Sequence, residues 1–270
     1  MNIPFYKMHG AANDFIMADD RLLTFPAHDK EWIARIAARR TGVGCEGVIL
    51  IQPSKTSSFR MRFFNPDGSE VEMCGNGARC VARLAHEIGA APAQMTIETI
   101  AGELKAEARD QEVLLYMTEP TDWRLNRSLD IDGKKLSYHF VNSGVPHVVV
   151  VTNDLEAIDV HKVGAAIRYH SDFAPKGTNA NFIVQTGPGT LRIRTYERGV
   201  EGETLACGTG MVAACLVAGK LGLVKPPVKI VPASGDLLTV NYELTETGAT
   251  QVTLLGPAVQ VFQGTLSYPG

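Results

Sequence analysis

Two short stretches of this 270-residue sequence place a cysteine at the predicted start of a helix. They read EMCGNGARC over residues 72–80 and LACGTGMVAAC over residues 205–215. A cysteine in this position faces the unpaired N–H groups of the first helical turn and the positive end of the helix dipole. Both features lower the pKa of a thiol from its usual value of about 8.5. We therefore expect Cys74 and Cys207 to be reactive thiols.

The glycines of the two Cys-Gly-x-Gly motifs are suited to a site that holds an anion. Glycine on either side of Asn76 and Thr209 allows the backbone to come close to a ligand. The N–H groups at the start of the helix can bind a carboxylate or a phosphate. A single motif of this kind is equally well explained by a structural cysteine beside a turn, so the prediction depends on the presence of two copies.

The sequence repeats itself with the spacing that separates the two motif cysteines. Both copies contain a segment with arginine at alternate positions between apolar residues, which is typical of a half-buried strand. Three matches in the same order predict two copies of one structural unit. The matched segments are residues 13–17 with 146–150, residues 44–52 with 177–185, and residues 59–65 with 191–197, the last pair one residue out of phase.

The pattern of apolar residues predicts an α+β protein with many strands and few helices. Regular alternation of strands and helices, which a Rossmann sheet requires, is missing. We predict two pseudo-symmetric domains, each a strand-rich sheet wrapped around a central helix that begins after the cysteine, with the active site in the cleft between them. The predicted helices cover residues 29–40, 78–89 and 210–222, and the predicted domains cover residues 1–118 and 119–259, with a tail of residues 260–270 that returns to the first domain.

Composition and charge limit the classes of function. Hydrophobic residues make up 45% and charged residues 20% of the chain, as in globular proteins. The net charge of −3 argues against nucleic-acid and membrane-surface partners, which favour a basic face. No apolar run reaches the length of a membrane helix, and the first residues do not form a signal-peptide pattern. We expect a cytoplasmic protein whose cysteines form no disulfide framework.

Two thiols that face each other across a cleft are suited to one kind of chemistry. One thiol can be ionised while the other keeps its proton, so a proton can leave one face of a carbon and return on the other face. This exchange inverts a stereocentre. The remaining cysteines do not join in this reasoning: Cys45, Cys80 and Cys215 are expected to be structural, and their spacing does not resemble a zinc motif.

Longer motifs around the two cysteines resemble those of diaminopimelate epimerases. They are FNPDGSEVEMCGNGARC, YERG followed by GETLACGTG, KMHGAANDF and PHVV, and the resemblance extends to the closing GPAVQVFQGTL. It implies an isomerase that interconverts LL- and meso-diaminopimelate by proton transfer at the α-carbon, in the biosynthesis of lysine and of peptidoglycan precursors. It also implies that neither pyridoxal phosphate nor a metal takes part, and that the protein is a homodimer with a small-molecule substrate.

The resemblance implies a role for each of twelve residues. Cys74 and Cys207 correspond to the acid–base thiols, with His147 and Glu197 as polar residues beside them. The distal carboxylate of the substrate is assigned to Arg198, whose guanidinium can bind a carboxylate through two hydrogen bonds. The residues that correspond to substrate-binding positions are Asn13, Asn65, Gly75, Asn76, Asn179, Glu197, Arg198, Gly208 and Thr209.

The sequence departs from the family pattern at three places. One residue more than usual separates Glu197 from Cys207, and we expect the loop with Val200 and Glu201 to bulge. Val145 stands in the place of an asparagine, so one distal contact is expected to be lost or provided by Asn142. In addition, Gly47 stands where some members have glutamine.

Three alternative functions remain open on the residues alone. A racemase of the same fold that acts on proline has no use for the distal set Asn65, Asn179 and Arg198. A non-catalytic protein that binds amino acids does not need a thiol at both helix starts. A thiol redox protein favours two cysteines within one C-x-x-C turn, which this sequence lacks.

Overall fold

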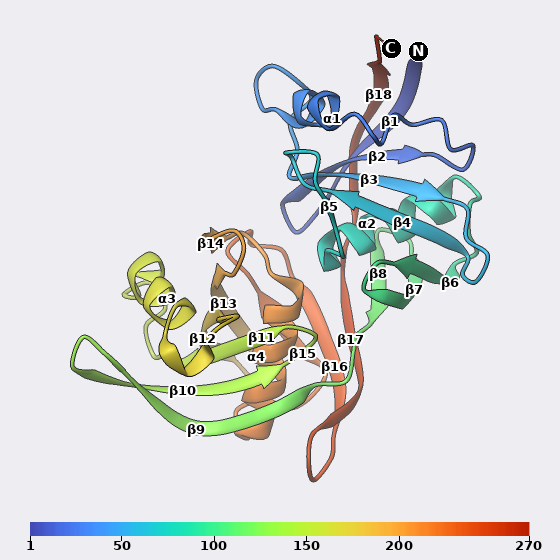
Figure 1. The fold of residues 1–270 in the computed structure, drawn as a ribbon. Helices are drawn as coiled ribbons and strands as arrows, with labels where there is room; N and C mark the ends of the chain where they lie inside the picture. Colours follow the sequence, from blue (N-terminus) through green and yellow to red (C-terminus); the bar gives the residue numbers. More distant parts are fainter. Residues whose placement is uncertain (270) are drawn as a thin grey trace. The chain divides into compact units, whose positions relative to one another are not determined.

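The computed structural model describes residues 1–269 and divides them into two compact units, coloured along the chain in Figure 1. The first unit contains residues 1–115 and the C-terminal segment that begins at Gly256. The second unit is the continuous stretch of residues 116–255. Both units consist of mixed sheets with a few helices, so the predicted α+β class is confirmed.

The first unit is a mixed sheet that packs against helix α2. Strands β2 and β3 are parallel, β4 is antiparallel to β3 and to β5, and β6 is parallel to β4. The elements are β1 (Asn2–Gly10), β2 (Asn13–Asp19), α1 (Lys30–Ala37), β3 (Gly47–Gln52), β4 (Phe59–Phe64), β5 (Glu70–Val71), α2 (Gly75–Glu87), β6 (Gln94–Thr99), β7 (Gly102–Arg109), β8 (Glu112–Tyr116) and β18 (Val259–Ser267).

The second unit repeats this order of pairing. Strands β11 and β12 are parallel, β13 is antiparallel to β12 and to β14, and β15 is parallel to β13. The elements are β9 (Thr121–Ile131), β10 (Lys134–Asn142), β11 (Pro146–Val151), α3 (Val160–Arg168), η1 (Ser171–Phe173), β12 (Asn179–Gly187), β13 (Thr190–Glu197), β14 (Gly202–Thr204), α4 (Gly208–Lys220), β15 (Val228–Val231), β16 (Leu238–Leu244) and β17 (Ala249–Pro257).

The strand register confirms that the chain contains two copies of one unit. Phe15 lies opposite Gly47 where β2 pairs with β3, and Val148 lies opposite Ala180 where β11 pairs with β12. Both residues of the second pair follow those of the first by the spacing that separates Cys74 from Cys207. Because a slip of one residue would turn every side chain to the other face, a shared register means that the two copies point the same residues inward.

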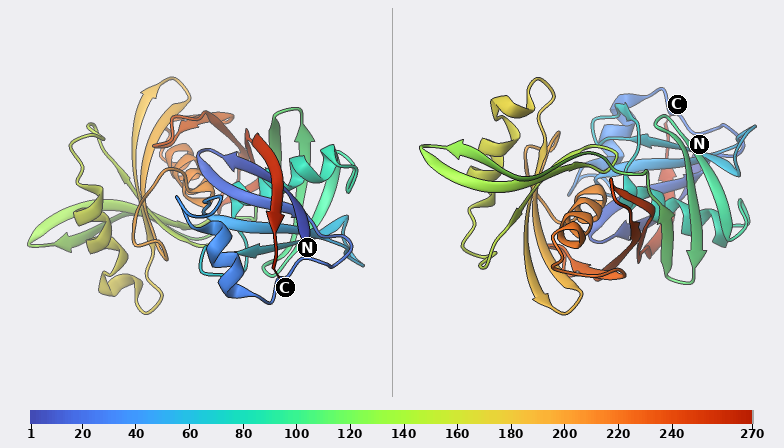
Figure 2. Two further views of the ribbon diagram at one scale, coloured as in Figure 1. Left: turned by 90° about the horizontal axis from the view of Figure 1, so that it is seen from above. Right: turned by 90° about the horizontal axis from the view of Figure 1, so that it is seen from below.

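The two ends of the chain meet in the first unit. Strand β18 runs antiparallel to β1, with Asn2 opposite Ser267, and Figure 2 shows the two strands side by side. The N-terminal ammonium group donates a hydrogen bond of 2.6 Å to the carbonyl of Tyr268. The Tyr268 ring packs edge to face on Trp32 of α1, with 5.1 Å between the ring centroids. The last strand therefore belongs to the core that the first strands build.

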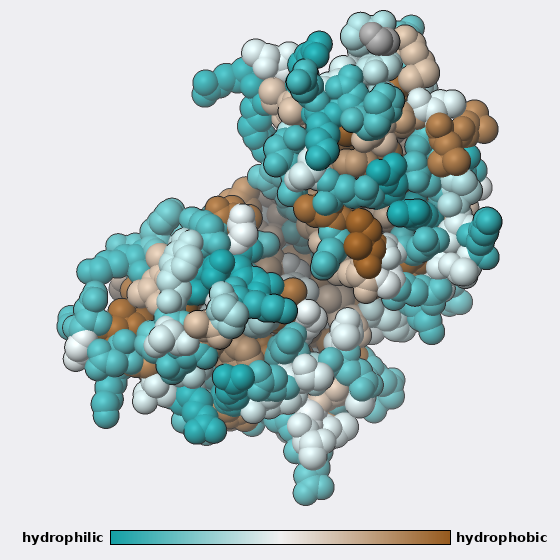
Figure 3. All heavy atoms as spheres, viewed as in Figure 1, coloured by the Kyte–Doolittle hydropathy of each residue, from teal (hydrophilic) through white to brown (hydrophobic). Residues whose placement is uncertain are grey.

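A largely buried helix packs against the sheet of each unit. Residues 210–219 of α4 are all buried, and the helix contacts strands β10 to β13, β15 and β16. Helix α2 buries Val81 and Leu84 against the first sheet, as predicted from their spacing. On the face seen in Figure 3 most of the surface of both units is hydrophilic. No helix within the described chain has the length and apolar character needed to cross a membrane.

The sequence analysis missed helix α3 and the β9–β10 hairpin. Helix α3 contains Gly164 in its middle, and a Cβ atom there would lie 2.4 Å from Cβ of Tyr196. The glycine allows the helix to approach β13, but it weakens the helical pattern in the sequence. Helices α2 and α4 begin at Gly75 and Gly208, earlier than the predicted ranges 78–89 and 210–222. The sequence pattern missed these first turns because they are rich in glycine, which weakens the helical signal.

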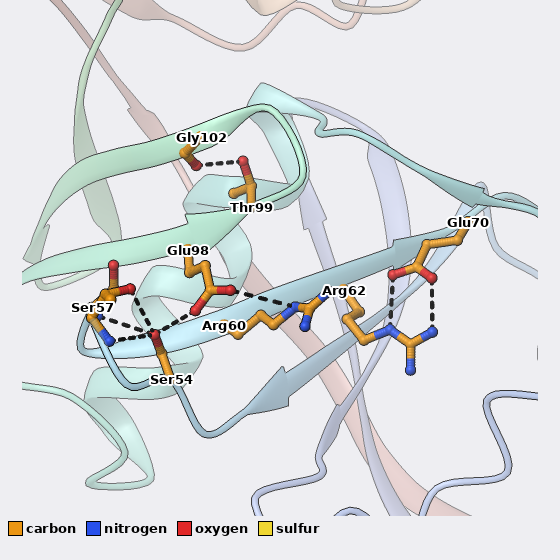
Figure 4. A network of polar contacts seen from close by, with 9 residues as sticks. Ser54, Ser57, Arg60, Arg62, Glu70, Glu98, Thr99 and Gly102 are labelled. Atoms are coloured by element: carbon orange, nitrogen blue, oxygen red, sulfur yellow. Dashed lines mark hydrogen bonds and ion pairs between the residues drawn. The ribbon is translucent and has the colours of Figure 1, made fainter.

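A matched ion pair crosses the hairpin that leads to each motif cysteine. In the first unit Arg62 donates two hydrogen bonds of 2.8 and 2.7 Å to Glu70, as Figure 4 shows. In the second unit Arg194 donates bonds of 2.7 and 2.8 Å to Glu203. Each glutamate precedes its cysteine by four residues. The two-point contact of guanidinium and carboxylate holds the two strands of the hairpin together just before the cysteine.

We predict that breaking one of these pairs loosens its hairpin more than it destabilises the protein. Glu70→Gln should lower the free energy of unfolding by less than about 1 kcal/mol, because the pair is partly exposed. Amide hydrogen exchange in residues 65–69 should increase several-fold, because the turn loses its cross-strand contact. Asp19→Asn breaks a similar pair with Arg21 and is the control. Equal amide hydrogen exchange of residues 65–69 in both variants would show that the pair of Arg62 and Glu70 does not hold this hairpin.

Candidate active site

Cys74 and Cys207 occupy the same place in the two units. Cys74 is the N-cap residue of α2, with φ −133° and ψ 124°, and Cys207 is the N-cap residue of α4, with φ −118° and ψ 108°. Cys207 is 7% exposed, and Cys74 is half-buried. The extended backbone of an N-cap residue sets the side chain beside the first N–H groups of the helix. The structure therefore gives both thiols the environment that the sequence pattern indicates.

Amide side chains surround the Cys74 thiol. Cys74 Sγ lies 3.4 Å from Asn13 Oδ1, which also accepts a hydrogen bond of 3.3 Å from Asn76 Nδ2. Asn76 Oδ1 in turn accepts a bond of 2.9 Å from the buried guanidinium of Arg79. The amide nitrogen of Asn13 donates to the carboxylate of Glu46. Two of the predicted substrate-binding residues are thus joined to Cys74 by hydrogen bonds.

A hydroxyl and an imidazole stand beside the Cys207 thiol. The hydroxyl oxygen of Thr209 lies 3.7 Å from Cys207 Sγ and 2.9 Å from His147 Nε2. The other ring nitrogen of His147 lies 3.1 Å from Asn181 Nδ2. The backbone of Thr209 is held as well, because its carbonyl accepts a bond of 2.9 Å from the hydroxyl of Ser143. A continuous chain of polar contacts therefore leads from the buried sheet to the sulfur.

Burial keeps the His147 ring neutral. The side chain is fully buried, and the loss of hydration lowers its pKa from 6.5 to about 3, with the positive charge of Arg198 as a smaller cause. A neutral imidazole has one N–H donor and one acceptor nitrogen. His147 can therefore connect Asn181 to Thr209 without adding a charge to the site.

Three other predicted substrate-binding residues lie at or next to the ends of strands: Asn179 begins β12, Glu197 ends β13, and Asn65 follows β4. Asn179 accepts a bond of 2.8 Å from the backbone N–H of Arg198 and donates one of 2.9 Å to the carbonyl of Pro146. The carboxylate of Glu197 accepts a bond of 2.9 Å from the hydroxyl of Thr204. Asn65 is placed differently: its amide lies 3.4 Å from the hydroxyl of Ser69 within its own hairpin.

An ion pair with helix α3 holds the loop that contains the extra residue. Glu201 adopts a left-handed φ of 57°, and its carboxylate accepts bonds of 3.1 and 2.9 Å from Arg168 and one of 3.1 Å from the N–H of Gly199. Glu201 therefore fixes the turn that follows Arg198. The pairing of β13 with β14 continues to Glu197 and Gly202 without a shift in register.

The two other departures from the family pattern also have a structural reason. A Cβ atom at Gly47 would lie 2.2 Å from the ring of Phe63, so this ring fills the space that a longer residue would need. Asn142 accepts a bond of 3.0 Å from the N–H of Gly144 and so closes the turn before Val145. Its side-chain oxygen stabilises the backbone of that turn.

The second glycine of each motif serves packing rather than ligand approach, which corrects the expectation. A Cβ atom at Gly77 would lie 2.6 Å from Ile49 Cδ1, and one at Gly210 would lie 2.4 Å from Asn181 Oδ1. At Gly75, in contrast, no atom lies within 4 Å of the Cβ position. The first glycine of the Cys74 motif thus fits the idea of open space near the thiol.

The three remaining cysteines are buried, and burial raises the pKa of each thiol. The pKa of Cys80 rises to about 12, and the pKa values of Cys45 and Cys215 also lie above the usual range. These side chains are structural, as predicted. Within residues 1–269 no three His, Cys, Asp or Glu side chains are grouped so that they could hold a metal ion.

Several residues of the site escaped the sequence analysis. Asn181, Thr195, Glu46 and Arg79 all belong to the hydrogen-bonded groups around the two sulfurs. Asn181 follows Asn179 by two residues, so both point to the same face of β12. Arg79 lies within the first motif itself. These two positions carried a signal that could have been used.

Comparison with solved structures gives the class of fold. A PhzF-family phenazine biosynthesis protein of Bacillus anthracis superposes with a TM-score of 0.75 at 17% identity, covering 99% of this chain and 100% of that one. A probable proline racemase of Agrobacterium radiobacter gives a TM-score of 0.71 at 17% identity, covering 98% and 93%. The chain thus has the fold that PhzF-family proteins share with proline racemases.

Comparison of sequences gives the family within this class. The family model described as "Diaminopimelate epimerase" matches residues 5–123 and 139–261. The diaminopimelate epimerase of Aquifex aeolicus is 42% identical over 97% of both chains, and that of a Hydrogenobaculum species is 44% identical over 97% of this chain and 98% of the relative. The chain belongs to the diaminopimelate epimerase family.

We predict that the glycines of the motifs differ in their effect on stability. Gly210→Ala should lower the free energy of unfolding by about 1–3 kcal/mol, because the new methyl group overlaps Asn181. Gly75→Ala should leave the free energy unchanged or raise it by up to about 1 kcal/mol, since alanine favours the helix and meets open space. Urea unfolding measures both, and equal losses would contradict the packing role.

We predict that His147 makes folding dependent on pH. The folded pKa of about 3 lies below the value of about 6.5 in the unfolded chain, so this contribution is complete above pH 6.5 and is lost as the pH falls toward 3. Over this range the free energy of unfolding should fall by up to about 1.4 kcal/mol per pH unit from this group. His147→Gln should reduce the slope measured by urea unfolding. The exposed His28→Gln is the control and should leave it unchanged.

Proposed function

We propose that this chain interconverts LL- and meso-diaminopimelate with Cys74 and Cys207 as its two acid–base groups. By its family it is a diaminopimelate epimerase, an isomerase of lysine biosynthesis. The observation that supports the role of the thiols is their equivalent position as N-cap residues of α2 and α4 in a duplicated fold. Each unit contributes one thiol to the reaction.

In the proposed reaction one sulfur gains a proton from the α-carbon and the other sulfur gives a proton to it, so the total charge does not change. A thiolate removes the α-proton and becomes a thiol, and the electron pair stays on the α-carbon. The second thiol then gives its proton to the opposite face of that carbon and becomes a thiolate. The centre is inverted, and the two sulfurs have exchanged protonation states. The mechanism requires both sulfurs to reach the same α-carbon, from opposite faces.

The site must stabilise negative charge on the α-carbon. Backbone N–H groups at the starts of α2 and α4, at Gly75, Asn76, Gly208 and Thr209, are suited to hold the adjacent carboxylate. Asn13, Asn65 and Asn179 provide amide groups for the substrate, and Arg198 provides a guanidinium for the distal carboxylate. Glu197 and His147 complete the polar surroundings. Binding of the distal carboxylate by Arg198 selects a substrate with a second carboxylate, which proline lacks.

We further infer a cytoplasmic homodimer. The family resemblance supports both points, and the exposed apolar side chains of Val261 and Phe262 on β18 are suited to be covered by a second copy.

The proposed mechanism predicts that each thiol is essential for inversion. With LL-diaminopimelate in deuterium oxide and no added cofactor, the reduced protein should form the meso isomer with deuterium at the α-carbon. Cys74→Ala and Cys207→Ala should each lower the rate of inversion by at least about 100-fold, because a positioned acid or base is lost. Nuclear magnetic resonance and chiral chromatography measure uptake and inversion.

Cys45→Ala is the matched control, because it removes a buried thiol that lies outside the two motifs. It should retain inversion. Binding of diaminopimelate without exchange in the unmodified protein would instead favour the non-catalytic binding function. Full inversion in either motif variant would refute the role of that thiol.

A further inference from the structure

The helix starts do not distinguish the two motif thiols, but their hydrogen-bond partners do. Both cysteines are N-cap residues, so each is next to the positive end of a helix dipole. Cys74 contacts an amide oxygen, and Cys207 contacts a hydroxyl group. An amide oxygen can only accept a hydrogen bond, whereas a hydroxyl can donate one. The direction of each bond therefore depends on the groups behind these partners.

Arg79 and Glu46 orient the side chains next to Cys74 so that an amide oxygen, a hydrogen-bond acceptor, faces its sulfur. Arg79 can only donate, so the atom of Asn76 that it contacts is the oxygen, and the Asn76 nitrogen faces Asn13. At the other end the Glu46 carboxylate can only accept, so the Asn13 nitrogen faces Glu46. Both ends leave Asn13 Oδ1 toward Cys74 Sγ. A sulfur beside this oxygen is stabilised when it carries a proton to donate.

The group behind Cys207 fixes its partner as a donor. Asn181 Nδ2 donates a bond of 2.8 Å to the carbonyl of Val148, and Asn181 Oδ1 accepts one of 3.0 Å from Thr195. The ring nitrogen of His147 that faces this amide nitrogen is therefore the acceptor, and the ring proton lies on Nε2. His147 Nε2–H donates to Thr209 Oγ1. The hydroxyl proton of Thr209 is then available to Cys207 Sγ, which is stabilised as a thiolate.

From these two chains we propose that the substrate-free protein holds Cys207 as the thiolate and Cys74 as the thiol. Asn181, His147 and Thr209 are positioning residues for Cys207, and Asn13, Asn76 and Arg79 are positioning residues for Cys74. The inference deepens the proposed function, since it states which sulfur is ready to remove a proton first. Its direct consequence is that a resting protein deprotonates substrate from the Cys207 side.

Charged groups lie on both sides of the proposed thiol pair. On the Cys74 side they are Arg79, the neighbouring Cys80 thiol and Glu46, whose carboxylate lies 3.6 Å from Arg39. On the Cys207 side they are the guanidinium of Arg198, which acts on the neutral His147 ring, and the carboxylate of Glu197, which accepts a hydrogen bond from Thr204. Both sides therefore contain a guanidinium and a carboxylate, and the assignment rests on the direction of the two hydrogen-bond chains.

The test is the pH dependence of alkylation at each sulfur in the reduced protein without substrate. Iodoacetamide is applied at a series of pH values, and mass spectrometry of peptides gives a rate for each cysteine. Each rate is divided by its own plateau at high pH, which removes the difference in exposure. At the pH where the alkylation rate of Cys207 reaches half of its plateau, the alkylation rate of Cys74 should be at least about tenfold below the Cys74 plateau. Coincident profiles, or a Cys74 profile at lower pH, would overturn the proposal.

A pair of variants tests the role of Thr209. Thr209→Val removes the hydroxyl and should lower the thiolate fraction of Cys207 at least about tenfold at a pH below its midpoint. Thr209→Ser keeps the hydroxyl and should restore the profile, which a purely structural loss would not do. Cys74 in the same sample is the internal control and should change less. A Thr209→Val profile like that of the unmodified protein would remove Thr209 from the proposal.

These measurements do not need turnover, so the two proposals can fail separately. If alkylation follows the predicted order but no α-proton exchange occurs, the proposed function fails and the protonation assignment stands. If exchange and inversion occur but the order is reversed, the assignment fails and the proposed function stands. A Thr209→Val variant that does not fold leaves the order in the unmodified protein to decide.

Discussion

The structure depends on one constraint: a thiol is held where a buried helix begins. A helix start offers partial positive charge, but only a well-packed helix keeps that charge in place. Helix α4 is buried along residues 210–219, and α2 is anchored by Val81 and Leu84. The hairpins before the cysteines, with their arginine–glutamate pairs, fix the other side of each turn. Most of the sheet in each unit serves to hold this short junction.

Duplication gives the two thiols equivalent backbone positions, and the differences between the two units make the thiols unequal. The parallel strand pairs keep one register in both units, so the two sulfurs inherit equivalent backbone positions. The side chains that contact them differ, with an amide oxygen in one unit and a hydroxyl in the other. Two identical sites could share one proton, but neither sulfur would be preferred for it.

The sequence was sufficient for the fold class, the repeat and the place of both cysteines, because these follow from periodicity and from long motifs. It was not sufficient for Asn181 or Glu46, whose contacts depend on which residues of neighbouring strands lie opposite each other. Register of this kind comes from tertiary packing. Helix α3 was missed for a related reason, since Gly164 is explained only by its contact with Tyr196.

The pairing of β18 with β1 also orders events during synthesis of the chain. The second unit is continuous, so all of its residues are present once residue 255 has left the ribosome. The first unit, although made earlier, lacks an edge strand until the last residues of β18 emerge. During this interval the edge of β1 that later pairs with β18 exposes a row of backbone donors and acceptors, and such edges can pair with other chains. The half of the protein that is translated first is therefore the half that completes its sheet last.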